Sequence, residues 1–176
     1  MRHLDVPVFA RRKERLGPMQ IRPTAVQPHL PSTALPNADW ADAYEIETQR
    51  EFPDMKSAAL CIVGGMPRWA KPLLWLRNVI VAPFGLKPGD QRIVQADVEH
   101  VDFFPILSET DEQIVLGLDD RHLDFRILLE RQAAQSGARY RLTTLVERHN
   151  LFGRTYLFLI TPFHKLIVRS VLTNAL

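Results

Sequence analysis

The sequence predicts an α+β fold in which an antiparallel sheet wraps around a long C-terminal helix, with two shorter helices after the first strand. Three patterns carry this prediction: alternation of apolar and polar residues over 42–48, helical periodicity over 55–82, and a run of alternating segments before a long apolar pattern at 151–172. Strands in hairpin succession, with helices segregated from them, favour an antiparallel sheet over a wound parallel one.

The first strand and the first helix are marked by a change of period. Tyr44 and Ile46 alternate with Glu45 and Glu47, which is typical of a half-buried strand. A helical spacing then follows, with Pro53 placed at the first helical position and a stop at Gly64 and Gly65, and its apolar positions are Met55, Ala58, Ala59, Ile62 and Val63. The second helix is expected over residues 67–82.

Four further strands are expected, at residues 101–107, 113–118, 122–131 and 139–148. Pro105 would place the first of them at an edge or a bulge. We expect turns at residues 108–112 and 119–121 and a loop at residues 133–138. Asn150 is a suitable cap for the last helix, which we expect to be interrupted at Pro162.

The composition of the chain limits the classes of protein to which it can belong. A length of 176 residues with 46% hydrophobic and 24% charged residues fits one domain with a real core. The single cysteine, Cys61, excludes an intrachain disulfide. There is no apolar leader and no run of about 18 apolar residues, so we expect no transmembrane segment and a cytoplasmic protein.

Residues 1–37 differ from the rest of the chain. They contain six of the 13 prolines and have six basic against two acidic residues, whereas the remainder has 16 basic against 18 acidic. We interpret residues 1–37 as a proline-rich, basic, extended arm and residues 38–176 as the folded domain. No nucleic-acid-binding module is evident, so no nucleic-acid partner is expected.

The two long strands sort their side chains by face. If the loop is centred between Ala134 and Gln135, Glu130 lies opposite Arg139 and His122 lies opposite Glu147. An even shift of register would preserve this segregation. The pattern places a charged set on the outer, solvent side, namely His122, Asp124 and Arg126, and an apolar set toward the helix, namely Leu123, Phe125, Ile127, Leu129, Tyr140, Leu142, Thr144 and Val146.

The order of elements resembles the helix-grip superfamily, which includes the START lipid-transfer domains, the birch-pollen allergens and the aromatic polyketide cyclases. Three stretches, PRWAKPLLWLRNVIVAPFGLK (67–87), FPILSETDEQIVLGLDDRHLDFRILLE (104–130) and VERHNLFGRTYLFLITPFHKLIVRSVL (146–172), resemble an uncharacterised bacterial family of unknown function within it. The resemblance covers roughly residues 38–172. It implies a fold and a cavity between sheet and helix, and no activity.

The leading functional hypothesis is therefore a binding module for a small hydrophobic or aromatic molecule. Trp75 either completes the core or serves as part of a lid. The residues expected to contact the ligand are Trp75, Leu123, Phe125, Ile127, Tyr140, Leu142, Thr144, Tyr156 and His164.

Two alternatives stay open. One is an enzyme similar to polyketide cyclases, in which Tyr140, Thr144, Tyr156 or His164 would act on such a molecule. The other is an interaction subunit that associates through the basic arm or the polar hairpin face, where an outer face can also form a homodimer.

Metal and cofactor sites are not expected. His100 and Asp102, and likewise His122 and Asp124, have the His-x-Asp spacing, but this spacing is unspecific and no Cys/His quartet accompanies it. No Rossmann fingerprint is present. Catalysis by His122 and Asp124 is disfavoured because groups on a solvated face rarely acquire shifted pKa values.

Overall fold

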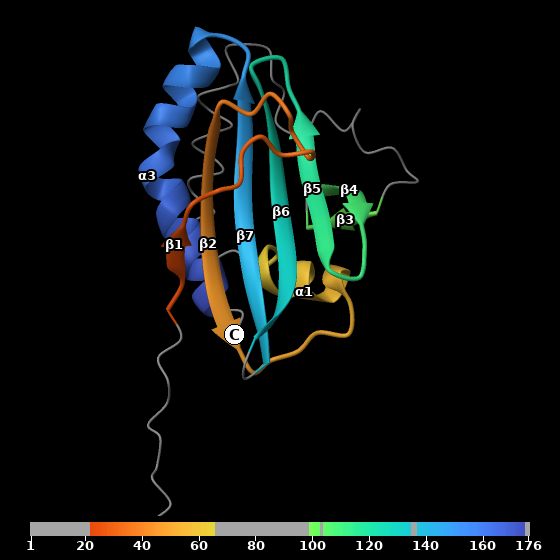
Figure 1. The fold of residues 1–176 in the computed structure, drawn as a ribbon. Helices are drawn as coiled ribbons and strands as arrows, with labels where there is room; N and C mark the ends of the chain where they lie inside the picture. Colours follow the sequence, from red (N-terminus) through yellow and green to blue (C-terminus); the bar gives the residue numbers. More distant parts are fainter. Residues whose placement is uncertain (1–21, 66–98, 103, 135–136, 175–176) are drawn as a thin grey trace, which may run out of the picture.

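The computed structural model describes residues 22–65, 99–102, 104–134 and 137–174 (Figure 1). Within them, seven strands form one antiparallel sheet in the order β1-β2-β7-β6-β5-β4-β3. The strands are β1 (Thr24–Val26), β2 (Trp40–Thr48), β3 (His100–Val101), β4 (Phe104–Glu109), β5 (Gln113–Asp119), β6 (Leu123–Ala134) and β7 (Gly137–Arg148). The helices are α1 (Met55–Ile62) and α3 (Leu151–Asn174). The α+β architecture with an antiparallel sheet and a C-terminal helix is confirmed.

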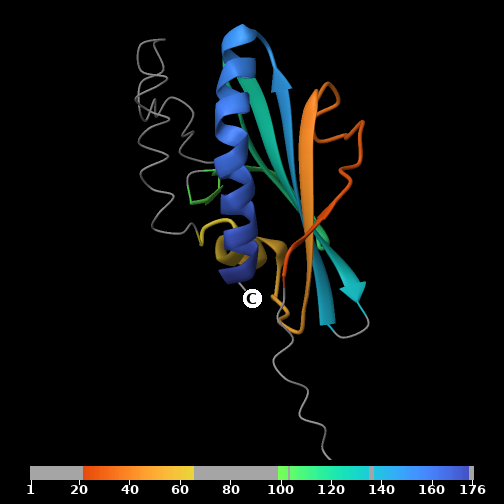
Figure 2. The same ribbon diagram turned by 90° about the vertical axis from the view of Figure 1, so that its left-hand side faces the viewer.

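Both helices lie on one face of the sheet, here called the inner face (Figures 1 and 2). The long helix α3 runs along β2 and β7, while α1 packs across β3, β5 and β6 and also touches α3. Their apolar sides close a single core against the strands. Its largest fully buried side chains are Val101, Leu116, Ile114, Leu129, Tyr140, Met55, Ile62 and Leu172.

The β6–β7 hairpin is the longest pairing in the sheet, and its register differs from the expected one by two residues. Glu130 lies opposite Arg141, and Phe125 lies opposite Val146. The strands continue to Ala134 and Gly137, so the expected loop at 133–138 is mostly strand. Because the shift is even, the two faces keep their side chains and the predicted segregation is retained.

The strand expected at residues 101–107 is two strands. Asp102 has a φ of 56°, in the left-handed region that Asp tolerates better than most residues. The chain turns there, so β3 pairs back on β4, with His100 opposite Pro105. The irregularity expected at Pro105 lies just after it in β4, as a shift of register between Ile106 and Ser108.

Helix α1 begins at Met55, two residues later than the expected first helical position at Pro53. The Asp54 carboxylate accepts a hydrogen bond from the Ser57 backbone N–H at 2.6 Å, so Asp54 is the N-cap and Pro53 precedes it. The second expected helix, at residues 67–82, lies outside the described residues.

Helix α3 continues through Pro162, contrary to the expected interruption. Pro162 has no backbone N–H, so one carbonyl of the preceding turn has no helical donor. Because Pro162 lies on the exposed side of the helix, water can donate a hydrogen bond to that carbonyl. Arg154, Lys165 and Arg169 of α3 are exposed. The sheet covers only one side of α3, and several large apolar side chains remain exposed: Leu151, Phe158, Leu159, Phe163 and Leu166.

The outer face of the sheet is not simply solvated, which corrects the expectation from the charge pattern. The segment 27–39 crosses in front of β7 and β6 (Figure 1). Arg141 is buried beneath it and donates hydrogen bonds to the Gln27 carbonyl and toward the His29 ring. Thr143 and Leu145 of the same outer row are also buried. The first described strand, β1, pairs with β2 within what was interpreted as an extended arm.

The start of α3 is held tightly against the hairpin. The Asn150 side chain caps the helix by accepting from the Gly153 N–H at 3.0 Å. A Cβ at Gly153 would lie 2.2 Å from the His122 carbonyl oxygen, which is a backbone atom and has little room to move.

We therefore expect Gly153→Ala to destabilise the protein by about 1–3 kcal/mol, as overpacking does. In an ordinary helix position the same substitution would stabilise, because Ala has the higher helix propensity. Urea unfolding of this variant, with Thr155→Ala on the exposed side of α3 as control, measures the effect. A Gly153→Ala protein as stable as the parent would contradict the close contact.

Candidate functional site

The inner face of the sheet changes from fully buried to half-buried along the strands. In one cross-strand row, Tyr44, Leu142 and Leu129 lie side by side on β2, β7 and β6, and all are buried in the core. The next row toward the start of α3 consists of Asp42, Thr144 and Ile127, and here Asp42 and Ile127 are only half-buried. The part of the inner face beyond the core is thus incompletely covered.

A further row continues this trend. Trp40, Val146 and Phe125 lie side by side, and both Trp40 and Phe125 are half-buried. The ring of Phe125 makes an edge contact with Phe104 of β4, with centroids 5.7 Å apart. Leu123, at the start of β6, is also half-buried. These side chains form a half-buried apolar surface beside α3.

A carboxylate and an imidazole meet at the edge of this surface. His164 of α3 and Asp42 of β2 approach to 3.1 Å between Nε2 and Oδ1, and their side chains are 22% and 14% exposed. The other carboxylate oxygen, Asp42 Oδ2, is buried and has no hydrogen-bond partner among the described residues. A buried acceptor without a partner is costly and therefore calls for a donor.

Two aromatic residues flank this pair. The ring of Trp40 stands edge-on to that of His164, with centroids 5.7 Å apart. Tyr44 follows on the same strand face, and burial together with the nearby Asp42 charge raises the pKa of its hydroxyl, while Arg169 opposes the shift. The Asp42–His164 pair therefore lies in a partly desolvated, aromatic environment, which strengthens the electrostatic interaction between the two side chains.

A groove borders the same carboxylate on the side of β1. It has a volume of about 370 Å³ and is lined by the end of β1, by Asp42 and Tyr44 of β2, and by Lys165 of α3. The groove is shallow and open to solvent. Asp42 thus lines this groove and shares a cross-strand row with Ile127 of the half-buried apolar surface.

The predicted ligand residues fall into three groups. Tyr140, Leu142 and Thr144 are buried, and Tyr140 lies at the centre of the core against Phe52. Trp75 lies outside the described residues. The half-buried members are Leu123, Phe125, Ile127, Tyr156 and His164.

Asp42 and Trp40 were not predicted from the sequence as site residues. A signal was present, because Asp42 shares the strand face of Tyr44 and Ile46, and a carboxylate on the apolar face of a strand requires a partner. The partner, His164, lies 122 residues away in the sequence, and only the path of α3 along β2 brings it near.

The charged stretch at the β5–β6 turn forms local ion pairs. Arg126 pairs with Asp119 at 2.6 Å. Asp124 meets His149 rather than His122, with Oδ2 and Nε2 3.2 Å apart. His122 is not on the solvent side as expected, because β6 begins only at Leu123 and the His122 ring packs on Phe152.

Comparison with known proteins places the chain in a family. Residues 34–171 match the family described as "Protein of unknown function (DUF2867)", and the chain therefore belongs to it. No curated protein and no solved structure matches. Among the described residues, no helix is both long enough and apolar enough to cross a membrane.

The pKa shifts of the tyrosines predict an alkaline instability. Burial raises the pKa of Tyr140, as it does for Tyr44. The folded state then holds these protons more tightly than the unfolded state, so the free energy of unfolding falls once the pH passes the ordinary tyrosine value of about 10. Urea unfolding at pH 8 to 11 should show this decline, and Tyr44→Phe should reduce it. If the free energy of unfolding falls with pH as steeply in Tyr44→Phe as in the parent protein, Tyr44 is excluded as a source of the decline.

Proposed function

We propose that this DUF2867 protein binds a small, mainly apolar molecule on the inner face of its sheet, beside α3. The observation that carries the proposal is the half-buried Asp42–His164 pair at the edge of the half-buried apolar surface of β6. A carboxylate on an apolar strand face needs polar partners, and the second oxygen of Asp42 has none among the described residues. The domain fits a helix-grip architecture of START-like type, in which the space between sheet and C-terminal helix takes the ligand.

The apolar part of the molecule would lie on Leu123, Phe125 and Ile127. These side chains are already half-buried, so covering them further removes apolar area from water at roughly 25 cal/mol per Å². Aromatic edges of Phe125 and Phe104 favour a flat or aromatic ligand. Association also has an entropic cost, so affinity depends on how well this surface is preformed.

The polar part of the molecule would meet Asp42. Its Oδ2 is a buried acceptor without a partner among the described residues, so it selects a ligand with an O–H or N–H donor. Asp42 and Ile127 lie on β2 and β6, separated by β7, which corresponds to about 10 Å at the usual strand spacing. The ligand is therefore expected to combine an apolar body with one donor group roughly that far away.

Ligand binding is tested first on protein purified from cells. Mass spectrometry of an organic extract should reveal a small apolar compound at a near-stoichiometric amount. In parallel, the stripped protein should bind the fluorescent probe anilinonaphthalene sulfonate. Ile127→Ala should weaken binding of the probe by about tenfold, as expected for lost apolar contact in a pocket.

Leu128→Ala is the matched control, because Leu128 is the next residue of β6, is also half-buried and points to the outer face. It should leave probe binding unchanged. A clean extract together with equal probe affinity in both variants would refute the proposal.

A second candidate function is an enzyme that acts on the bound molecule. The specific observation is the 3.1 Å contact of His164 with Asp42, which resembles the way a carboxylate orients a general-base imidazole. If this candidate is correct, the extracted compound is converted on incubation with the protein. His164→Gln should then abolish the conversion while the compound still binds. Equal conversion by His164→Gln and the parent protein would remove the enzymatic candidate.

A further inference from the structure

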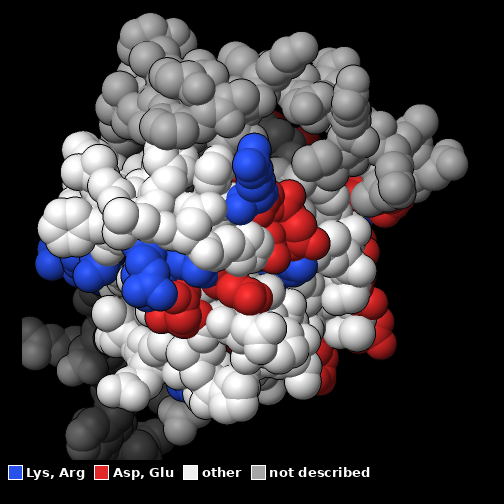
Figure 3. All heavy atoms as spheres, turned by 90° about the horizontal axis from the view of Figure 1, so that it is seen from above, with Lys and Arg blue, Asp and Glu red and all other residues white. Residues whose placement is uncertain are grey.

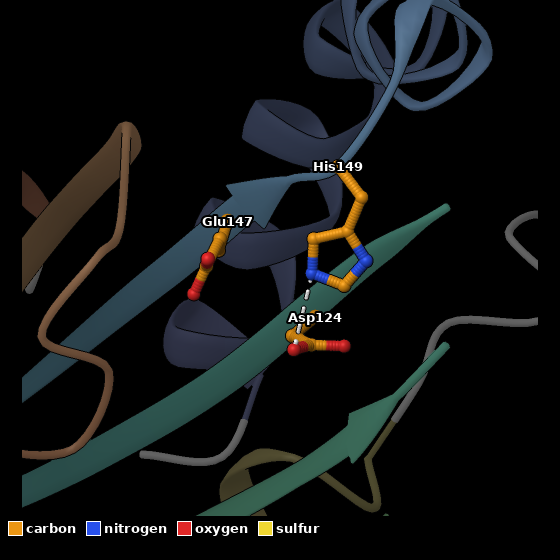
Figure 4. Close-up of side chains that lie close together, drawn as sticks. All are labelled: Asp124, Glu147 and His149. Carbon is orange, nitrogen blue, oxygen red and sulfur yellow. Dashed lines mark ion pairs between the residues drawn. The ribbon is translucent and has the colours of Figure 1, made fainter. Parts of the chain in front are cut away.

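A second group of ligating side chains lies on the opposite, outer face. Asp124, Glu147 and His149 each offer one ligand atom, and these atoms lie within 4.8 Å of one another. They come from the neighbouring strands β6 and β7, with His149 just beyond the end of β7 (Figure 4). This group is separate from the proposed ligand face, because side chains alternate across the sheet.

The strand register produces an unfavourable pairing at this point. Asp124 lies directly opposite Glu147, and like charges in directly opposed positions destabilise a sheet. His149 contacts Asp124, whereas the Glu147 carboxylate has neither an ion pair nor a hydrogen bond within the part of the chain that the structure describes. A cation between the two carboxylates would remove the repulsion.

The distances suit a metal ion. Two ligand atoms that are each about 2.1 Å from a tetrahedral or octahedral ion are about 3.0–3.4 Å apart. Asp124 Oδ2 and His149 Nε2 are 3.2 Å apart, so they already have this separation. Glu147 needs only a side-chain rotation to bring its carboxylate closer, and it is half-buried rather than locked in the core.

The surroundings also hold the first ligand in place. The second Asp124 oxygen, Oδ1, accepts a hydrogen bond from the Asp120 N–H at 3.0 Å. The backbone N–H of His149 donates to the His122 carbonyl at 3.0 Å, which extends the β6–β7 ladder to the histidine. Such outer contacts orient metal ligands in proteins.

We propose that Asp124, Glu147 and His149 bind a divalent first-row transition ion. Two carboxylates and one imidazole suit Mn²⁺, Fe²⁺ or Zn²⁺ better than an ion that requires oxygen ligands alone. Water would complete the coordination. The ion would link the end of the β6–β7 hairpin to the residue that leads into α3.

The test uses the full-length chain without a histidine tag, freed of metal by a chelator and titrated with Zn²⁺ by calorimetry. One equivalent should bind. Glu147→Gln and His149→Asn should each weaken binding at least about tenfold, since loss of even an outer-shell partner has an effect of that size. His100→Asn and Glu112→Gln, whose side chains lie outside the group, should bind as the parent does.

Mn²⁺ added to the unaltered, isotope-labelled protein keeps the test decisive if a variant fails to fold. Paramagnetic broadening should centre on the amides of residues 124 and 147–149. Absence of binding, equal affinity in Glu147→Gln and His149→Asn, or broadening centred elsewhere would each overturn the proposal.

Discussion

The placement of α3 over β2 and β7 is the constraint on which the rest of the structure depends. The helix starts where Gly153 lies against the His122 carbonyl, a contact that a Cβ would prevent. Asn150 caps this first turn, and its side chain also contacts the His122 ring. From this fixed start, α3 runs along one side of the sheet and ends against α1.

Three features follow from that path. Since α3 lies on β2 and β7 and α1 covers one end of β6, the other end of the inner face of β6 stays half-buried. His164 is carried to the carboxylate of Asp42, which would otherwise be an isolated charge on an apolar face. The same path leaves apolar side chains of α3 exposed, among them Phe158 and Leu166.

The opposite face has its own organisation. The segment 27–39 shields the middle of the outer face, with Arg141 buried under it near Glu45. Near the start of α3, charges are grouped on the surface, as the view from above shows (Figure 3). The sheet therefore separates a half-buried apolar face, where we propose the ligand, from a charged face, where we propose the ion. A homodimer through the polar hairpin face stays a prediction.

Local pattern predicted much of this architecture. Alternation in the β6–β7 hairpin assigned Phe125 and Ile127 to the inner face even though the register differed by two residues, because face depends only on parity. The helical spacing likewise predicted α1 and α3. Contacts between distant segments were not predictable in this way. From its strand pattern Arg141 is predicted to be solvated, and only the structure shows that residues 27–29 cover it. The contact of Asp124 with His149 likewise depends on a register that the sequence did not predict.

The central claim is that the half-buried surface of β6 beside α3 is a ligand site. Its most direct test is nuclear magnetic resonance of methyl-labelled protein with the compound recovered from cells, or with anilinonaphthalene sulfonate. The account predicts intermolecular nuclear Overhauser effects to the Ile127 and Leu123 methyl groups and a shift of the His164 ring signals. Contacts confined to the exposed side of α3, at Leu159 or Leu166, with the Ile127 signals unchanged, would contradict it.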